Sequence, residues 1–288
     1  MRVFITGVAG FIGSHLADKL LDEDCEVWGC DTFKQYHPAY PSELKRKNVE
    51  HNLENPNYNL IEGDFAGEEV AKVLLSTGFD YIIHLAAHAG VLPSLEDPEE
   101  YYQNNVVKSA KLLKLISKSP YQWQLKFIFA SSSSVYGGIE KLPWKETMDT
   151  SKPLSPYAGT KKALEDLCYM YHKITTVPMV GLRFFTVYGP RQRPDMAIAK
   201  FTKAIDEGTP IQIYGEQGQT FRDYTYIDDI VNGILSCLPG VAPFDIYNIG
   251  NGDPVELHEM LAEIGMHMGK VPVAEIMTPQ DGETKSTH

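Results

Sequence analysis

The sequence lacks the features that define several classes of protein. Its 288 residues include four cysteines and no CxxC pair, so it indicates neither a disulfide framework nor a zinc site. Lysine and arginine number 26 against 38 acidic residues, and a net charge of −12 disfavours nucleic acid and anionic membranes as partners. No apolar run is long enough to span a membrane. We therefore expect a cytoplasmic protein with reduced thiols and no metal.

Short apolar runs alternate with longer segments of helical periodicity. Strands are predicted at 2–6, 25–30, 58–63, 80–86, 125–130, 177–185 and 244–250, and helices over 11–21 and 101–119. Continuously apolar strands alternating with helices are typical of a parallel sheet covered on both faces. We predict a doubly wound α/β fold, with residues 1–185 and the strand near 244–250 in the main domain and 186–288 mostly in a smaller C-terminal lobe.

A glycine-rich turn separates the first strand from the first helix. Gly7, Gly10 and Gly13 would let the backbone approach a pyrophosphate at the positive end of that helix. Asp31 follows 18 residues after Gly13, close to the spacing of about 20 expected for an acid that binds the adenosine ribose. Its charge would repel a 2′-phosphate, so the pattern favours NAD over NADP. An ordinary acid at a strand end is the alternative interpretation, and Asp64 could contact the adenine or simply start a turn.

Tyr157 and Lys161 lie four residues apart, on one face of a predicted helix that Ser155 caps and Pro156 begins. A lysine cation near a tyrosine lowers the phenol pKa, so the phenolate can remove a hydroxyl proton while hydride leaves the same carbon. A second pair with this spacing, Tyr169 and Lys173, shows that spacing alone is not specific. The position of Tyr157 at the helix start, shortly after a run of serines, favours the first pair.

The serine run occupies residues 131–134, directly after an apolar strand. It is either a polar loop or a set of hydroxyls facing a substrate. His84 and His88 are also four residues apart, as in a metal pair, but they straddle a strand end, and a histidine bonded to backbone is the favoured interpretation.

Several longer motifs resemble one family of enzymes. The segments TGVAGFIG (6–13), HLAAHAGV (84–91), ASSSSVYG (130–137), SPYAGTK (155–161), RFFTVYGPRQRPDM (183–196) and FRDYTYIDDI (221–230) occur in the order seen in extended short-chain dehydrogenases/reductases that act on sugar nucleotides. The sequence resembles the UDP-glucuronate 4-epimerases most. The resemblance implies a Rossmann sheet, bound NAD, a UDP-sugar substrate and a homodimer. It also implies that Tyr157 is the catalytic base, Lys161 its partner and a ribose ligand, and Ser132 a hydroxyl on the sugar O4.

Further contacts follow from the same resemblance. The expected cofactor contacts are Gly7, Gly10, Phe11, Ile12, Gly13, Asp31, Asp64, Phe65, Leu85, Ala86, Ala87, Asn105 and Lys161. The expected substrate contacts are Ser133, Ser134 and Thr186, as donors to a sugar carboxylate, and Arg191, Arg193 and Arg222, with Arg222 on the diphosphate. Related dehydratases and decarboxylases carry acids where this chain has Ser133 and Ser134.

The resemblance leaves two other functions open, and the chain departs from the family pattern at Leu92-Pro93, at His88 and in the length of its last segment. The chain could epimerise a neutral UDP-hexose or a pentose, or it could bind NAD without catalysis. The segment after Gly252 is shorter than the resemblance implies, so either the sequence stops early or the substrate site is incomplete.

Overall fold

A parallel sheet of seven strands forms the centre of the protein. The structure is a computed structural model that describes residues 1–36, 40–214, 220–240, 242–277 and 286–287. The strand order is β10-β6-β5-β4-β1-β2-β3, and every neighbouring pair is parallel. The strands are β1 (Arg2–Thr6), β2 (Glu26–Asp31), β3 (Tyr58–Glu62), β4 (Tyr81–His84), β5 (Lys126–Ser132), β6 (Met179–Phe184) and β10 (Phe244–Ile249). This order confirms the predicted doubly wound fold. The direction in which successive strands are added to the sheet changes between β1 and β4, and folds of this type bind ligands at that point.

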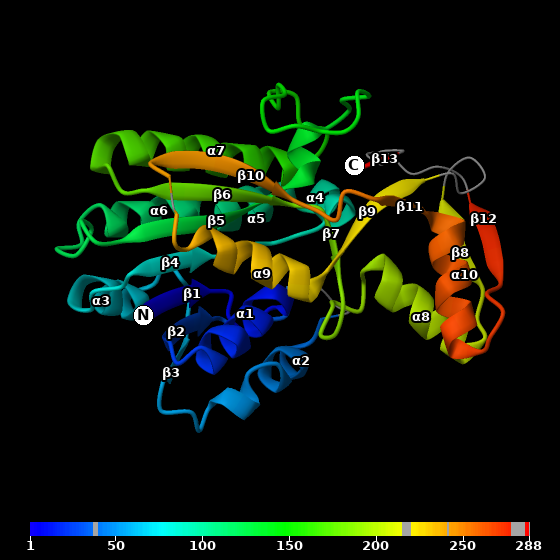
Figure 1. Ribbon diagram of the computed structural model, residues 1–288, viewed down its shortest axis with the longest axis horizontal. Coiled ribbons are helices and arrows are strands. Elements are labelled where there is room, and N and C mark those ends of the chain that lie inside the picture. Colours follow the sequence, from blue (N-terminus) through cyan, green and yellow to red (C-terminus); the bar gives the residue numbers. More distant parts are fainter. Residues whose placement is uncertain (37–39, 215–219, 241, 278–285, 288) are drawn as a thin grey trace.

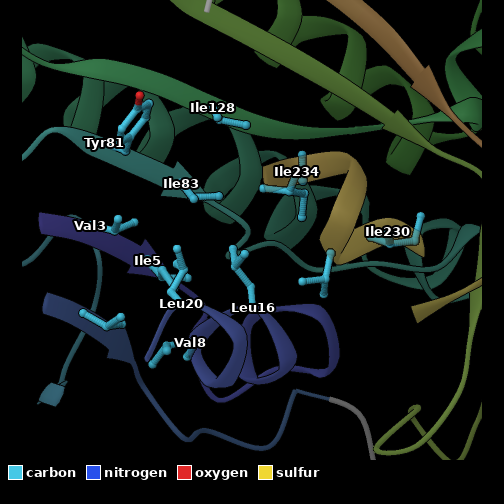
Figure 2. Packing of buried hydrophobic residues seen from close by; sticks show 14 of the residues in the cluster. Val3, Ile5, Val8, Leu16, Leu20, Tyr81, Ile83, Ile128, Ile230 and Ile234 are labelled. Atoms are coloured by element: carbon cyan, nitrogen blue, oxygen red, sulfur yellow. The ribbon is translucent and has the colours of Figure 1, made fainter. Parts of the chain in front are cut away.

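One face of the sheet is covered by α1 (Phe11–Asp22) and α9 (Ile227–Cys237). Figure 2 shows Leu16 and Leu20 of α1 and Ile230 and Ile234 of α9 among the strand residues, and all four side chains are fully buried. Their spacing of four residues puts each pair on one face of its helix. Although α9 lies within the residues expected to form the lobe, it packs against α1.

The opposite face is covered by α3 (Glu68–Ser76), α6 (Lys108–Ile116) and α7 (Pro156–Thr175). These helices bury Leu74, Leu113 and Leu164 in one cluster with the phenylalanines of β5. The sheet is therefore apolar on both sides, which explains why its strands read as continuous apolar runs rather than alternating ones.

The segment predicted as a single helix over 101–119 is interrupted. α5 (Pro98–Tyr102) passes into a π-helical turn, η2 (Gln103–Val107), before α6 begins. Asn105 lies in this turn and is buried, with its side-chain amide bonded to the backbone of His88 and to Thr160. These bonds hold the turn against the end of β4 and against α7, so the interruption is a tertiary effect that hydrophobic spacing does not reveal.

A smaller unit gathers at one end of the molecule (Figure 1). A core of Ile205, Ile211, Ile213 and Leu261 joins its helices and strands. The elements of this part are α8 (Ala197–Glu207), β8 (Ile211–Tyr214), α10 (Leu257–Met268) and β12 (Ala274–Met277), next to β7 (Thr186–Tyr188), β9 (Phe221–Tyr226), β11 (Pro254–Glu256) and β13 (Ser286–Thr287). Short elements elsewhere are α2 (Ser42–Lys47), η1 (Glu50–Asn52), α4 (Val91–Glu96) and η3 (Ser133–Tyr136). Most of residues 277–288 lies outside the described residues.

Within the described ranges, no helix combines the length and the apolar character that crossing a bilayer requires.

Candidate active site

The glycine turn packs tightly where β1 meets α1. Gly7 has a φ of +73°, and a Cβ on it would lie 2.9 Å from the Cα of Ala86, at the end of β4. A Cβ on Gly13 would lie 2.2 Å from the carbonyl oxygen of Gly7. Among the described residues no side chain caps α1, which starts at Phe11 after Gly10. The turn thus leaves first-turn amides of α1 for phosphate oxygens, at the reversal point of the sheet, and it fits a dinucleotide.

Asp31 ends β2 as predicted, and its carboxylate is buried. Oδ1 accepts hydrogen bonds from the amide of Phe33 and from Nζ of Lys45, at 2.9 and 3.1 Å. Lys45 was not anticipated, because it lies 14 residues along the chain and no local pattern connects it to Asp31. A carboxylate paired in this way is still suited to ribose hydroxyls, since it can accept further hydrogen bonds.

The remaining expected cofactor contacts follow the ends of β3 and β4. Asp64 starts a turn by accepting from the amide of Ala66, and it forms an ion pair of 2.7 Å with Lys108. Burial raises the pKa of Asp64, but the bonds from Lys108 and Ala66 outweigh it and the pKa is lowered. Phe65 is buried beside His84, with the ring centroids 4.9 Å apart. Ile12, Leu85, Ala86 and Ala87 are partly exposed along the same edge. An adenine contact at Asp64 stays a prediction.

The two histidines have unrelated surroundings. His84 is buried, and its ring nitrogens bond the hydroxyls of Thr6 and Ser109 at 2.7 and 3.0 Å, so the expected backbone partner is wrong for this residue. Burial, with a smaller effect of the Lys161 charge, lowers the pKa of His84 to about 3. His88 stacks on Tyr36 at 4.9 Å. No cluster of three or more metal-ligating side chains occurs in the described part of the chain.

Tyr157 and Lys161 lie in the first turns of α7, which Ser155 caps through a hydrogen bond to the amide of Ala158. Lys161 is buried and its Nζ donates to the carbonyl of Ala130 at 2.9 Å, 5.9 Å from the centroid of the Tyr157 ring. Burial lowers the pKa of Lys161 to about 8. Burial also raises the pKa of Tyr157, while a hydrogen bond to Ser132 and the charge of Arg193 oppose that effect. The structure therefore brings the three predicted catalytic residues together.

The serines lie at the end of β5 and in η3. The Oγ of Ser132 is 2.6 Å from that of Ser134 and accepts from its backbone amide. Ser133 is 9% exposed. Thr186 begins β7, directly after β6, and is partly exposed. Because β5 and β6 are adjacent parallel strands, their carboxyl ends carry these hydroxyls to one edge of the sheet.

The three arginines have different positions. Arg191 pairs with Asp18 of α1 at 2.7 Å. Arg193 is buried, donates to the carbonyl of Ala89 at 3.0 Å and pairs with Asp195. Arg222 lies on β9, partly exposed, with Nη1 on the carbonyl of Phe221. Of the two arginines in the 189–196 loop, Arg193 is the one whose charge affects Tyr157.

The second tyrosine–lysine pair is separate from this site. Tyr169 is 50% exposed, and Lys173 lies over its ring at 5.2 Å on the surface of α7.

Besides Lys45, two residues of the site were not anticipated from the sequence. Tyr101 packs edge-on against Tyr157, with the centroids 6.4 Å apart. Glu165 follows Lys161 by four residues, and the spacing 157, 161, 165 along one helix face could have revealed it.

The chain is similar to known proteins over most of its length. The model of the NAD-dependent epimerase/dehydratase family matches residues 3–250. A probable UDP-glucuronate 4-epimerase of Rhizobium meliloti (strain 1021) is 38% identical over 307 residues, which cover 100% of this chain and 88% of that protein.

Solved structures of 4-epimerases are also similar to this chain. The UDP-glucuronic acid 4-epimerase of Bacillus cereus, in complex with UDP-glucuronic acid and NAD, superimposes with a TM-score of 0.90 at 36% identity, covering 100% of this chain and 89% of that chain. The UDP-glucose 4-epimerase of Thermus thermophilus, in complex with NAD, has a TM-score of 0.86 at 30% identity, with 100% and 89% covered.

Proposed function

Because the chain belongs to the NAD-dependent epimerase/dehydratase family, we propose that it interconverts UDP-glucuronate and UDP-galacturonate by inverting C4 of the sugar. The observation that carries the proposal is the convergence of Ser132, Tyr157 and Lys161 beside a serine run that offers hydroxyls to a sugar carboxylate. The similarity to UDP-glucuronate 4-epimerases supports the same substrate.

Tyr157 acts as the base in this proposal. Its phenolate takes the proton from the sugar O4, and Ser132, which bonds Tyr157, steadies that oxygen. NAD, held by the residues described below, would supply the hydride acceptor and donor that oxidation and re-reduction at C4 require, so the reaction would have no net redox change. Tyr157 gives the proton back to O4 when C4 is reduced.

Lys161 supports the base through its charge. Its Nζ lies 5.9 Å from the centroid of the Tyr157 ring, and an ammonium at this position favours the phenolate form of Tyr157. Burial lowers the pKa of Lys161 to about 8, so the ammonium and the neutral amine are both accessible close to neutral pH. A contact of Lys161 with the cofactor ribose is part of the same proposal.

The sugar carboxylate would be held by hydroxyls rather than by opposite charges. Ser133, Ser134 and Thr186 stand at the adjoining ends of β5 and β6 and can donate without adding a like charge. Arg222 is proposed to bind the diphosphate, with Arg193 and Arg191 as further contacts on the substrate side. A neutral UDP-hexose stays as an alternative substrate, since the Thermus thermophilus relative acts on UDP-glucose.

The cofactor contacts follow from the turn geometry. The first-turn amides of α1, which follow Gly10, are proposed to hold the pyrophosphate, and Asp31, with Lys45 beside it, the adenosine ribose. The other expected cofactor residues are proposed to line the same edge. Residues 1–185 with 244–250 would form the dinucleotide domain, and 186–288 mostly the substrate lobe.

A homodimer and a cytoplasmic location complete the proposal. Large apolar side chains stay exposed on neighbouring helices α5 and α7, and contact with the same helices of a second copy would bury them. They are Tyr102, Tyr169, Met170 and Ile174. The four cysteines are all free thiols, as in a reducing compartment.

The deciding experiment is incubation of the protein with UDP-glucuronate and NAD, followed by chromatographic separation of the two C4 epimers. Conversion by the wild type, and none by Tyr157→Phe with NAD still bound, is expected. Parallel incubation with UDP-glucose distinguishes the neutral alternative. Retention of NAD without turnover of either sugar would instead indicate a binding protein.

A further inference from the structure

A buried ion pair stands one helical turn beyond Lys161. Glu165 of α7 and Arg183 of β6 are each 3% exposed. Two parallel hydrogen bonds join them, from Nε to Oε1 at 2.8 Å and from Nη2 to Oε2 at 2.9 Å. Burying two charges is costly unless their remaining hydrogen bonds are satisfied, and replacing such pairs by apolar residues often does no harm to stability. Stability alone therefore does not account for the pair.

The partners of this pair come from the elements that form the site. Ser131, the residue before Ser132, donates its hydroxyl to Oε1 of Glu165 at 2.6 Å. Nη1 of Arg183 donates to the hydroxyl of Tyr136 at 2.9 Å, and Tyr136 lies in η3, two residues after Ser134.

The chain of bonds continues to the edge of the sheet. The Tyr136 hydroxyl donates to Oδ1 of Asn248 on β10 at 2.7 Å, and the backbone amide of Asn248 donates to Glu146 at 2.8 Å. The network thus ties β5, β6, β10 and η3 to α7, and it fixes both ends of the serine run against the helix that carries Tyr157 and Lys161.

Among the described residues, few titratable groups surround Lys161, and Glu165 is the one that carries a negative charge. On α7 these groups are Tyr157 and Glu165. On β4 the neighbouring group is His84, which is neutral because its pKa is low. On β6, Arg183 is matched by Glu165. Burial pulls the pKa of Lys161 down, and the negative charge of Glu165 opposes that effect. Cys168, the next buried titratable group on α7, stays a neutral thiol because burial and Glu165 raise its pKa.

We propose that Glu165 is a positioning residue of the epimerase: held by Arg183 and Ser131, it maintains the ammonium form of Lys161 and the placement of the serine run against α7. The inference rests on the proposed function for its catalytic meaning. Glu165 acts through Lys161 and Ser131, since its carboxylate is fully engaged within the protein.

The first test measures Lys161 directly in the protein without substrate. Lysine labelled with ¹³C at Cε is titrated by NMR between about pH 6 and 10, with the signal assigned by its loss in Lys161→Met. Glu165→Gln is expected to lower the apparent pKa of Lys161 by about one unit or more, because the opposing negative charge is gone. Glu165→Asp keeps the charge and should leave the titration nearly unchanged. Glu26→Gln, which removes a partly exposed acid that pairs with Arg2 and begins β2, is the matched control.

The second test separates charge from packing through the pH dependence of kcat/KM. Glu165→Gln should move both limbs of the profile to lower pH, whereas Glu165→Asp should reduce kcat without moving them. The double variant Glu165→Gln/Arg183→Met leaves no unpaired buried arginine, so it serves as the test if the single variant does not fold. Lys161 should also have a lower pKa in this double variant.

The outcomes are distinguishable. A Lys161 titration that is unchanged in the single and the double variant overturns the inference, whatever the activity. A wild type that turns over no UDP-sugar contradicts the proposed function, while the NMR titration still decides whether Glu165 sets the charge of Lys161.

Discussion

Asp31 and Lys45 form an ion pair inside the protein, with Nζ 3.1 Å from Oδ1 and side chains that are 6% and 8% exposed. The acid expected to bind the adenosine ribose thus has a cation beside it. The carboxylate would repel a 2′-phosphate, whereas the ammonium would attract one, so we expect selectivity for NAD over NADP to depend on the pair rather than on Asp31 alone.

Replacing Asp31 should therefore remove the repulsion of NADP and also expose an ammonium group that attracts it. In Asp31→Ala, Lys45 loses its partner and can bind a 2′-phosphate, and one charge-assisted contact of about 1.5–3 kcal/mol should shift the Kd ratio of NAD to NADP by roughly 10- to 150-fold toward NADP. Equilibrium binding to cofactor-free protein measures the ratio. Asp31→Ala/Lys45→Ala should lose this gain, and an unchanged ratio in the single variant would contradict the role of the pair.

The charge of Arg193 should affect the pH at which the base becomes active. Arg193 helps to hold down the pKa of Tyr157 against burial, so Arg193→Met should raise that pKa and move the acidic limb of the kcat/KM profile to higher pH. Each unit of the shift corresponds to roughly a tenfold loss on the acidic side of the profile. Arg191→Met is the control for the loop, because Arg191 pairs with Asp18 and its loss should leave the limb in place. Equal shifts in both variants would refute the assignment.

Ser133 and Ser134 should contribute differently to the preference for UDP-glucuronate over UDP-glucose. If Ser133 donates to a sugar carboxylate, Ser133→Ala should reduce kcat/KM for UDP-glucuronate roughly tenfold or more beyond its effect on UDP-glucose. Ser134→Ala should harm both substrates, because Ser134 also bonds Ser132.

A product of the doubly substituted enzyme gives independent evidence. In Ser133→Ala/Ser134→Ala the 4-keto acid is held less firmly, so its carboxylate can align with the carbonyl and leave as carbon dioxide. The resulting enolate takes up a proton, and return to C4 of the hydride removed from it would give a UDP-pentose, which should appear on chromatography. Equal losses on both sugars without any pentose would mean that the serines form a polar loop.

His84 should make stability depend on pH. Its folded-state pKa of about 3 lies below the ordinary value of 6.5, so the unfolded chain takes up a proton first as the pH falls. Stability from this residue is therefore complete above about pH 6.5 and declines below it, by about 1.4 kcal/mol at pH 5.5. Urea unfolding of wild type and His84→Gln at pH 7.5 and 5.5 isolates the effect. The loss between the two pH values should be smaller in the variant, and equal losses would contradict the prediction.

The sequence by itself determined the features that depend on neighbouring residues. The first strand and the first helix lie where the apolar run and the glycine turn predict them, at Arg2–Thr6 and Phe11–Asp22, because backbone freedom and side-chain periodicity act over a few residues. The choice of Tyr157 over Tyr169 as the candidate base also came from local context, and the exposure of Tyr169 agrees with it.

The tertiary structure alone decided which distant groups meet. Hydrophobic spacing shows that a residue is buried but not which charge lies opposite, so it predicts neither Lys45 on Asp31 nor Arg183 on Glu165, which are separated by 14 and 18 residues. The π-turn at Gln103–Val107 has the same origin, since Asn105 is held by His88 and Thr160 from other elements. Burial forces polar groups to find partners across the sheet, and the chain fold determines which partners are within reach.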